Sequence, residues 1–261
     1  MKISKSQQEQ TRREIIRCAV DLITEQGYDG ASMKQIARAA GIGDATIYKY
    51  FASKEKIVLA YYELSLMISL ELLEEMPGWA EFTLQERLQA LLDTLLEIFL
   101  ADREFIAISR ELIAHSPLLL LREQLPMQQV LKQELLNWLN HAESQAEIPA
   151  CDFKNLIAGV FLDYLLAILT YWLNDESEEF HQTTQLVDLS LGILVSALSS
   201  GILNKVSDLL SFILRNQLHR AVSHGEGLLS ALSLLKQSGG AIRERAQQRR
   251  AKANVKPAED A

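Results

Sequence analysis

Residues 32–54 combine side chains that can bond phosphates and base edges with the glycines of a tight turn. A first short helix is predicted by apolar residues that share one face: Met33, Ile36, Ala37 and Ala40. Gly41 and Gly43 follow, and the next segment, 44–50, is short and carries polar and aromatic groups. Two short helices joined by a tight turn are typical of a helix-turn-helix, whose second helix enters the major groove of DNA. DNA binding is therefore the leading hypothesis.

Residues that end and begin helices occur where this interpretation needs them. Ser32 can accept a hydrogen bond from the first turn of the first helix, and Gly41 suits a left-handed C-cap. Asp44 is expected to cap the second helix and Ser53 a further one. Lys54 lies at the positive end of that further helix, where a cation costs a few tenths of a kcal/mol, so phosphate contact would explain it.

The ordered set resembles the N-terminal domain of the TetR/AcrR family of bacterial transcriptional regulators over residues 9–68. The matching segments are a first helix (11–26), Gly27-Tyr28, 32–37, 40–42, 46–48, 50–51 and 53–55. The resemblance implies an all-α protein with a three-helix helix-turn-helix domain at 9–68, its motif at 32–51. A helical effector-binding and dimerisation domain would follow at 69–237.

The resemblance also implies the residues that face DNA: Ser32, Met33, Lys34, Asp44, Ala45, Thr46, Tyr48, Lys49, Tyr50 and Lys54. Lys34 would reach a base edge or a phosphate, and Thr46 a phosphate or a thymine methyl. Lys49 would read guanine or only neutralise charge. Tyr48 and Tyr50 would offer a phenol to phosphate, with core packing as the alternative.

Two residues depart from the pattern of the family. Asp44 is acidic, so it would accept from a cytosine amino group or serve only as a cap. Met33 lacks the hydroxyl often found at its position, which leaves one phosphate bond unmade. Phosphate contacts set register and base contacts set specificity, and the sequence does not sort one kind from the other.

Charge is unevenly distributed along the chain. Residues 1–54 hold nine Lys and Arg against six Asp and Glu, a net charge of +3. The whole chain of 261 residues has a net charge of −8, so residues 55–261 carry −11. A basic head on an acidic body orients a molecule on a polyanion, whereas an ordinary solvated face would not place the excess on this motif.

The remainder reads as helices, with no convincing strand alternation. Helices are expected at 53–76, from a cap at Thr83 through the apolar positions up to Leu96, and over 105–115, 124–143, 152–174, 180–200, 204–223 and 228–236. The run 156–173 is long enough for a membrane span, but Asp163 lies in its middle, which favours a buried or dimer helix. The chain also starts without an apolar signal segment, and its two cysteines suit a reducing cytosol, so we expect a cytoplasmic protein outside the membrane.

Two apolar helices, 152–174 and 180–200, are the expected homodimer interface. A helix that is apolar nearly all round must be covered on more than one side. The pair forms a four-helix dimer interface in the family that the chain resembles. The alternative is that both helices are central to one protomer; we favour the dimer because a two-fold operator needs a two-fold protein.

The body is expected to hold a pocket for a small, apolar effector of unknown identity. Polar groups within apolar helices are the candidate contacts: Arg110, His115 and Asp163. Core groups and dimer contacts are the alternative roles for all three. Ligand binding would favour one pose of the fourth helix and so change the spacing of the two recognition helices. The protein would then be a repressor released from a palindromic, double-stranded operator.

Other classes of function have less support in the sequence. The five His show no metal-ligand spacing, and no phosphate loop, nucleophile elbow or HExxH motif occurs, so we expect no enzyme, no cofactor and no metal. A helical adaptor, or an enzyme-like ligand-binding protein that has lost operator binding, is the alternative; Lys34, Thr46, Tyr48 and Lys54 argue against it. The basic tail at 238–261 is expected to be disordered, with an additional DNA contact as the alternative.

Overall fold

The computed structural model describes residues 4–115, 126–206, 209 and 212; of 111–115 and 126 it describes the backbone alone. All regular structure in these residues is helical, which confirms the predicted all-α class. Contacts divide the chain into residues 1–201 and 202–261. The second unit is described only at 202–206, 209 and 212, which are helical. The rest of the helix expected at 204–223, the helix at 228–236 and the basic tail lie outside the described residues.

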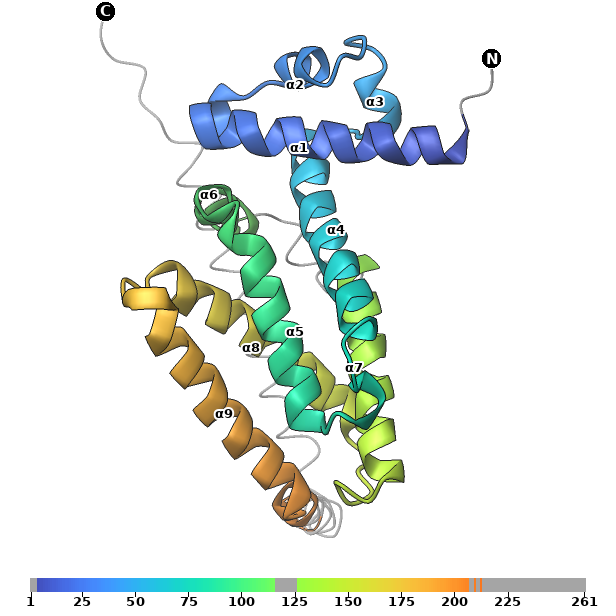
Figure 1. Cartoon of the computed structure of the whole chain (residues 1–261), viewed down its shortest axis with the longest axis vertical. Coiled ribbons are helices and arrows are strands. Elements are labelled where there is room, and N and C mark those ends of the chain that lie inside the picture. Colours follow the sequence, from blue (N-terminus) through green and yellow to red (C-terminus); the bar gives the residue numbers. More distant parts are fainter. Residues whose placement is uncertain (1–3, 116–125, 207–208, 210–211, 213–261) are drawn as a thin grey trace, which may run out of the picture. The chain divides into compact units, whose positions relative to one another are not determined.

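Helix α1 (Lys5–Gly30) is longer at both ends than the predicted helix at 11–26. Its start is earlier because the Ser4 side chain accepts a hydrogen bond from the Gln7 N–H, which caps the first turn. Gly27, at φ +73°, interrupts the helical dihedrals near the predicted end, and a residue without Cβ adopts that conformation at little cost. α1 packs against α2, α4 and α6, and Figure 1 shows it lying across the end of α4.

Helix α2 (Met33–Ala39) begins and ends as predicted. The Ser32 side chain accepts from the Gln35 N–H, and the Gln35 side chain accepts in return from the Ser32 N–H at 2.9 Å. At the other end Gly41 takes φ +66°, its N–H bonds the Arg38 carbonyl, and the next N–H bonds the Ala37 carbonyl. The left-handed glycine thus closes the helix and turns the chain towards α3.

Helix α3 (Ile47–Tyr50) is shorter than the expected 44–50, and Asp44 does not cap it. Its N-cap is Thr46, which makes no side-chain capping bond. Residues 44–46 form a tight turn instead, closed by the Thr46 N–H on the Gly43 carbonyl at 2.7 Å. The prediction of Asp44 as a cap was therefore wrong, because the helix starts three residues later.

Helix α4 (Lys54–Glu74), capped by Ser53 as predicted, joins the N-terminal helix-turn-helix to the helical body. The predicted domain boundary at residues 68 and 69 lies inside this unbroken helix. Two buried serines in α4 donate to carbonyls of their own helix, Ser65 to Tyr61 at 2.9 Å and Ser69 to Ser65 at 2.8 Å.

The body is completed by α5 (Leu84–Leu100), α6 (Arg103–His115), α7 (Pro126–Ser144), α8 (Lys154–Leu173) and α9 (His181–Ser199), with short 3-10 turns η1 (Trp79–Glu81) and η3 (Glu178–Phe180). Thr83 caps α5 in a reciprocal pair with Glu86. α4 packs on α5 and α7, α8 on α7 and α9, and α9 on α5. Buried leucines and aromatic rings from these helices form the core.

The turn between α8 and α9 is held by one buried carboxylate. Asp175 accepts hydrogen bonds from the backbone N–H and the hydroxyl of both Ser177 and Thr183, at 2.6 to 2.9 Å. The guanidinium of Arg103 donates to the carbonyls of Trp172, Leu173 and Asp175 and so closes the end of α8. The start of α6 is thereby tied to the turn that orients α9.

Candidate DNA interface and effector cavity

The exposed side of α3 presents two side chains of the predicted DNA-facing set. The Tyr48 side chain is 58% exposed, and Lys49 beside it is also exposed. Ile47 is fully buried on the opposite side and fixes the orientation of the helix. Tyr48 therefore reaches solvent, which excludes the core-packing alternative for this residue, whereas Tyr50 is half-buried and keeps both roles open.

Arg12 supports α3 from below and was missed by the sequence analysis. Its guanidinium lies 4.7 Å from the ring centre of Phe51, the residue that ends α3, and it also pairs with Glu63 of α4 at 3.3 Å. A guanidinium over an aromatic face contributes about 0.5–1 kcal/mol at a partly exposed site. The contact links α1, α3 and α4, and the sequence signal for it, a cation on the predicted first helix, is too common to identify it.

Lys34 and Asp44 form an ion pair at the surface of the motif. The Lys34 Nζ lies 3.6 Å from the Asp44 carboxylate, and both side chains are more than half exposed. Exposed pairs of this kind contribute about 0–1 kcal/mol, so phosphate can compete for the lysine. Arg38 lies one helical turn after Lys34 on the same face of α2 and is exposed. It was not among the predicted DNA contacts, although its spacing from Lys34 was available in the sequence.

Lys54 is placed inside the motif and not on its outer surface. Its Nζ donates to the carbonyls of Tyr28 and Ala31, the latter at 2.6 Å, and lies 4.0 Å from the ring centre of Tyr28. Burial lowers the pKa of Lys54. The ammonium thus joins the end of α1 to the start of α4, and this role explains a cation at a helix N-terminus without phosphate.

The other predicted contacts lie at the start of α2 and just before α3. The Ser32 hydroxyl is used within its capping pair with Gln35. Met33 and Thr46 are half-buried, and Ala45, next to Thr46 in the turn, is exposed. The structure therefore brings the predicted set together around α2 and α3, with Ser32 and Lys54 engaged in holding the motif.

An apolar cavity of about 140 Å³ lies within the helical body. We call it the inter-helix cavity; its lining residues come from α4, α5, α6, α7 and α8 and include Leu59, Tyr62, Leu92, Phe99, Leu131 and Leu169. Burial raises the pKa of Tyr62 to about 12, and its hydroxyl shares a 2.7 Å hydrogen bond with Ser109. The phenol is therefore neutral and already satisfied, so the lining is chiefly hydrocarbon.

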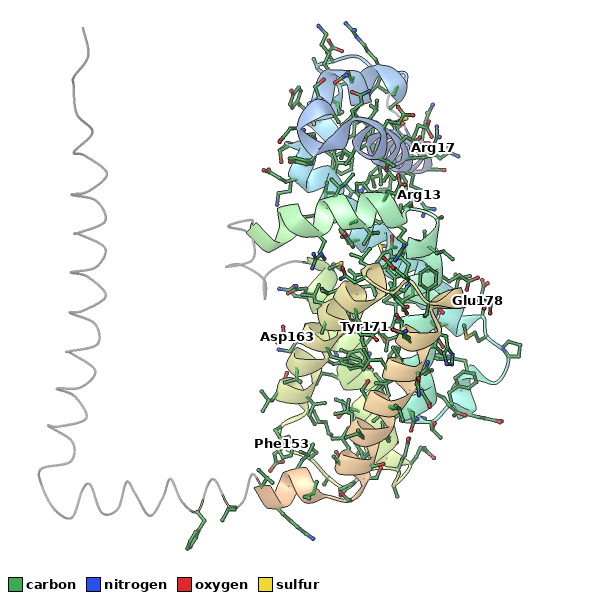
Figure 2. All side chains as sticks on the ribbon, turned by 90° about the vertical axis from the view of Figure 1, so that its left-hand side faces the viewer. Arg13, Arg17, Phe153, Asp163, Tyr171 and Glu178 are labelled. Atoms are coloured by element: carbon green, nitrogen blue, oxygen red, sulfur yellow. The ribbon has the colours of Figure 1, made fainter. Side chains whose placement is uncertain are left out.

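The three predicted effector contacts do not converge on this cavity. Arg110 lines it. Asp163 is exposed and borders a separate groove between α7 and α8, and Figure 2 shows it at the outer edge of α8. The side chain of His115 lies outside the part that the structure describes. All three residues were predicted because each is a polar group in an apolar helix. That criterion does not show which side of the helix faces the cavity.

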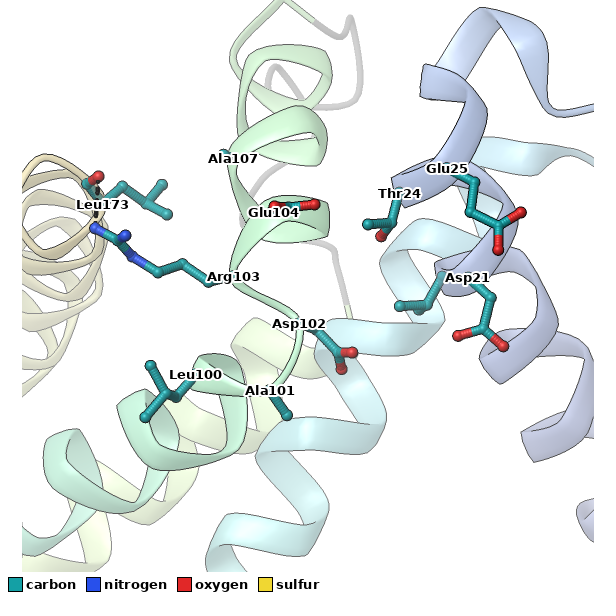
Figure 3. A pocket seen from close by; sticks show the side chains of 11 residues that line it. Asp21, Thr24, Glu25, Leu100, Ala101, Asp102, Arg103, Glu104, Ala107 and Leu173 are labelled. Carbon is teal, nitrogen blue, oxygen red and sulfur yellow. Dashed lines mark hydrogen bonds between the residues drawn. The ribbon is translucent and has the colours of Figure 1, made fainter.

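A second hollow, of about 680 Å³, lies where α1 meets the start of α6. Figure 3 shows Asp21 and Glu25 of α1 on one side and Asp102 and Glu104 on the other. Arg103 points away from these acids to the Leu173 carbonyl, as the dashed line marks. This open groove, with four acids among its lining residues, lies between the helix-turn-helix domain and the body.

Helices α8 and α9 leave large apolar side chains in solvent. Leu156 is 65% exposed, Leu189 58% and Ile193 73%, and Val160 and Tyr171 are also exposed. By length and composition α8 could cross a membrane, alone among the described helices, although core helices of soluble proteins pass the same test. Only 28% of its most apolar window is buried within this chain. We call the exposed apolar side of α8 and α9 the α8–α9 face.

The N-terminal helices form a helix-turn-helix whose second helix faces outward, and one continuous helix joins them to a helical body with an apolar cavity. This arrangement is that of a DNA-binding regulator. Two family models match the chain: bacterial regulatory proteins, tetR family, at residues 15–61, and tetracyclin repressor-like, C-terminal domain, at residues 87–213. The chain belongs to the TetR family of bacterial regulators. Proteins of this family are transcription regulators and generally not enzymes.

Similar proteins include the HTH-type transcriptional regulator AcrR of Shigella flexneri, 25% identical over 190 residues, which cover 68% of this chain and 88% of that protein. The fatty acid metabolism regulator protein of Bacillus subtilis is 39% identical over 62 residues, 24% of this chain. That match spans about a third of the regulator's length, 32%.

Solved structures share the fold. A putative TetR-family transcriptional regulator from Syntrophomonas wolfei superposes with a TM-score of 0.60 at 20% identity, covering 73% of this chain and 97% of that one. The regulator FadR from Bacillus subtilis, solved in complex with stearoyl-CoA, superposes with a TM-score of 0.54 at 22% identity, covering 72% and 98%.

Proposed function

We propose that two copies of this protein bind a palindromic DNA operator as a repressor, and that a small, largely apolar molecule in the inter-helix cavity releases them. The observation that carries the proposal is the pairing of an exposed α3 surface with an apolar cavity, connected through α4 and α6. We propose repression, and release by an effector, because both are common in the TetR family. This function requires the cytoplasm, where the chromosome lies.

In the proposed complex α3 enters the major groove. Tyr48 and Lys49 are its accessible side chains, and Lys34 and Arg38 of α2 flank it with positive charge. Ala45 and Thr46 lie at the N-terminal end of α3, the end that faces base edges in helix-turn-helix complexes. We assign phosphate contact to the lysines, Arg38 and the Tyr48 phenol, and we leave Ser32 and Lys54 as supports of the motif.

The α8–α9 face is the proposed dimer contact. Its exposed leucine, isoleucine and valine side chains recur about one helical turn apart on each helix, which is more apolar exposure than singly scattered residues give. A second copy would cover this face and place two copies of α3 on one side of the duplex. Half-sites about one helical turn apart, 34–36 Å, would then be bound together.

The proposed coupling runs from the cavity through α6 to α4. Arg110 lines the cavity, and the adjacent Ser109 bonds Tyr62 of α4. Tyr61 of α4 donates to Asp102, at the other end of α6, at 2.8 Å. A ligand that moves α6 therefore acts on the part of α4 nearest the DNA-binding end, and α6 also packs on α1.

The relatives support an apolar effector. The FadR structure from Bacillus subtilis was solved with stearoyl-CoA, whose acyl chain is hydrocarbon. The cavity of this chain offers a hydrocarbon lining of its own. Linkage then requires that DNA weaken effector binding by the same factor by which effector weakens DNA binding.

Selection of bound DNA from a random pool, followed by gel shifts at rising salt, tests the proposal. A palindrome is expected, and Lys49→Ala should lower the salt slope of log K by about 0.9, the amount for one lost phosphate contact. Tyr48→Ala should weaken binding without unfolding the protein. Arg17→Ala is the matched control, because Arg17 is an exposed cation of α1 paired with Glu14 and Asp21.

Two results would contradict the proposal. No selected sequence at any salt concentration would favour the adaptor that has lost operator binding. An equal loss of affinity for Arg17→Ala and Lys49→Ala would show that net charge, and not the α3 surface, governs binding.

A further inference from the structure

The inter-helix cavity is small and shaped by hydrocarbon. Its volume of about 140 Å³ is close to that of an engineered protein cavity of about 150 Å³ that binds benzene. Leucine side chains from α4, α5, α7 and α8 form most of its walls. The apolar part of a ligand that fills it therefore holds about six to eight carbons, by comparison with benzene.

One charged group interrupts this lining. Arg110 enters from α6, and among the described lining residues no acid stands near it to neutralise its charge. Its Nη1 has a long 3.5 Å contact with the Thr170 hydroxyl. Its Nε is buried and has no hydrogen-bond partner among the described groups.

A buried guanidinium N–H without an acceptor is unfavourable, so the arrangement favours a ligand that supplies one. A carboxylate matches the planar fork of arginine, because its two oxygens accept two parallel N–H bonds. An alcohol offers a single neutral oxygen, and an ammonium ion would be repelled.

We propose that the effector class of this protein is the ionised form of a medium-chain carboxylic acid, with its chain in the inter-helix cavity and its carboxylate on Arg110. This inference rests on the proposed function for the role of the ligand as effector, but the binding itself does not depend on DNA. An acyl thioester has no free carboxylate at that position, so the assignment separates free acids from acyl-CoA.

Titration calorimetry on the full chain tests it with octanoate, octanol and octylammonium. Octanoate should bind at least about tenfold more tightly than the other two, the factor for one charge-assisted hydrogen bond. Arg110→Gln should weaken octanoate by about ten- to a hundredfold and leave octanol unchanged. Arg110→Lys keeps the positive charge but lacks the planar guanidinium. Its affinity for octanoate should lie between those of Arg110→Gln and the unaltered protein.

Lys132→Gln is the matched control, because Lys132 borders the separate groove between α7 and α8. Its affinity for octanoate should equal that of the unaltered protein. Thermal melts of both Arg110 variants show whether they fold, and the ranking of the three ligands on the unaltered protein needs no variant.

Octanol binding as tightly as octanoate would overturn the proposal, as would octanoyl-CoA binding where octanoate does not. Equal octanoate affinity in folded Arg110→Gln would do the same. Gel shifts on the same preparations separate the two proposals. Octanoate binding without DNA binding would contradict only the proposed function as a regulator. DNA binding without octanoate binding would contradict only the assigned ligand class.

Discussion

At the scale of single residues, two side chains of the motif oppose each other in charge. Asp44 lies beside the proposed DNA-facing residue Lys34 and holds it in an ion pair at 3.6 Å. Its negative charge would repel phosphates that approach the lysine. Asp44 thus limits affinity in the proposed complex, and it does so without capping a helix.

Asp44→Asn should strengthen operator binding. The change removes a negative charge near phosphate and frees Lys34, so the salt slope of log K should rise by about 0.9, the amount for one added contact. Gel shifts between low and moderate salt measure the slope. Weaker binding by Asp44→Asn, with loss of preference at one base pair of the selected site, would instead show that Asp44 accepts from cytosine.

Lys54→Met should destabilise the protein while leaving the salt slope unchanged. The ammonium joins the carbonyls of Tyr28 and Ala31, so its loss should cost about 1–2 kcal/mol of unfolding free energy in urea. Lys56→Met is the control, an exposed lysine of the same turn. A reduced slope with unchanged stability would return Lys54 to the phosphate contacts.

At the scale of elements, helix ends that depend on adjacent residues were predictable. Ser32, Gly41, Ser53 and Thr83 all close or open helices as expected, because a cap needs only a side chain or a φ angle within four residues. The prediction of a cap at Asp44 was wrong because an aspartate occurs equally well in a turn or in an ion pair. Local sequence does not distinguish these uses.

Contacts between distant elements were not predictable in the same way. Lys54 lies 26 residues from Tyr28, and Arg12 lies 51 from Glu63, so their partners follow from the crossing of α1 over α4. The same holds for Arg110 and Asp163, both polar groups in apolar helices. Only the packing of α6 and α8 shows that one lines the cavity and the other an outer groove.

The α8–α9 turn is the element whose stability should depend on acid. Although burial would raise the pKa of Asp175, hydrogen bonds from Ser177 and Thr183 hold it well below its ordinary value. Below a pH of about 4 the unfolded chain binds the proton first. The stability that Asp175 supplies is therefore complete above that pH and is lost as the pH falls towards its lowered pKa.

Asp175→Asn should lower the melting temperature at pH 7, because one amide oxygen replaces two carboxylate oxygens that accept four hydrogen bonds. The difference from the unaltered protein should shrink below pH 4. Circular dichroism melts at pH 7 and pH 3 measure it, with the exposed Asp188→Asn as control. A difference that is constant with pH would show that the carboxylate charge is not what holds the turn.

At the scale of the whole molecule, the α8–α9 face connects the fold to the proposed two-fold operator. A helix with so little of its apolar window buried needs cover beyond what the described residues of its own chain supply. The proposed second copy meets this need and supplies the second α3. Assembly and operator binding should therefore be lost together.

Ile193→Asp should convert the proposed dimer to a monomer, since it places a charge at the most exposed apolar position of the face. Sedimentation velocity should show the dissociation constant raised at least about tenfold, and gel shifts should show the loss of two-half-site binding. Met67→Asp, at an exposed apolar site on α4, is the control. A dimer that persists in Ile193→Asp would place the interface elsewhere.

The buried serines of α4 have a consequence for the barrier to motion. Ser65 and Ser69 bond only carbonyls of their own helix among the described groups, so this part of α4 can shift along α5 and α7 without breaking a hydrogen bond there. Tyr61 and Tyr62, one turn nearer the DNA-binding end, are bonded across to Asp102 and Ser109. Among the described residues, the side-chain hydrogen bonds that hold α4 to Asp102 and to α6 are thus the two phenol bonds, and phenylalanine at either position should speed the exchange between poses.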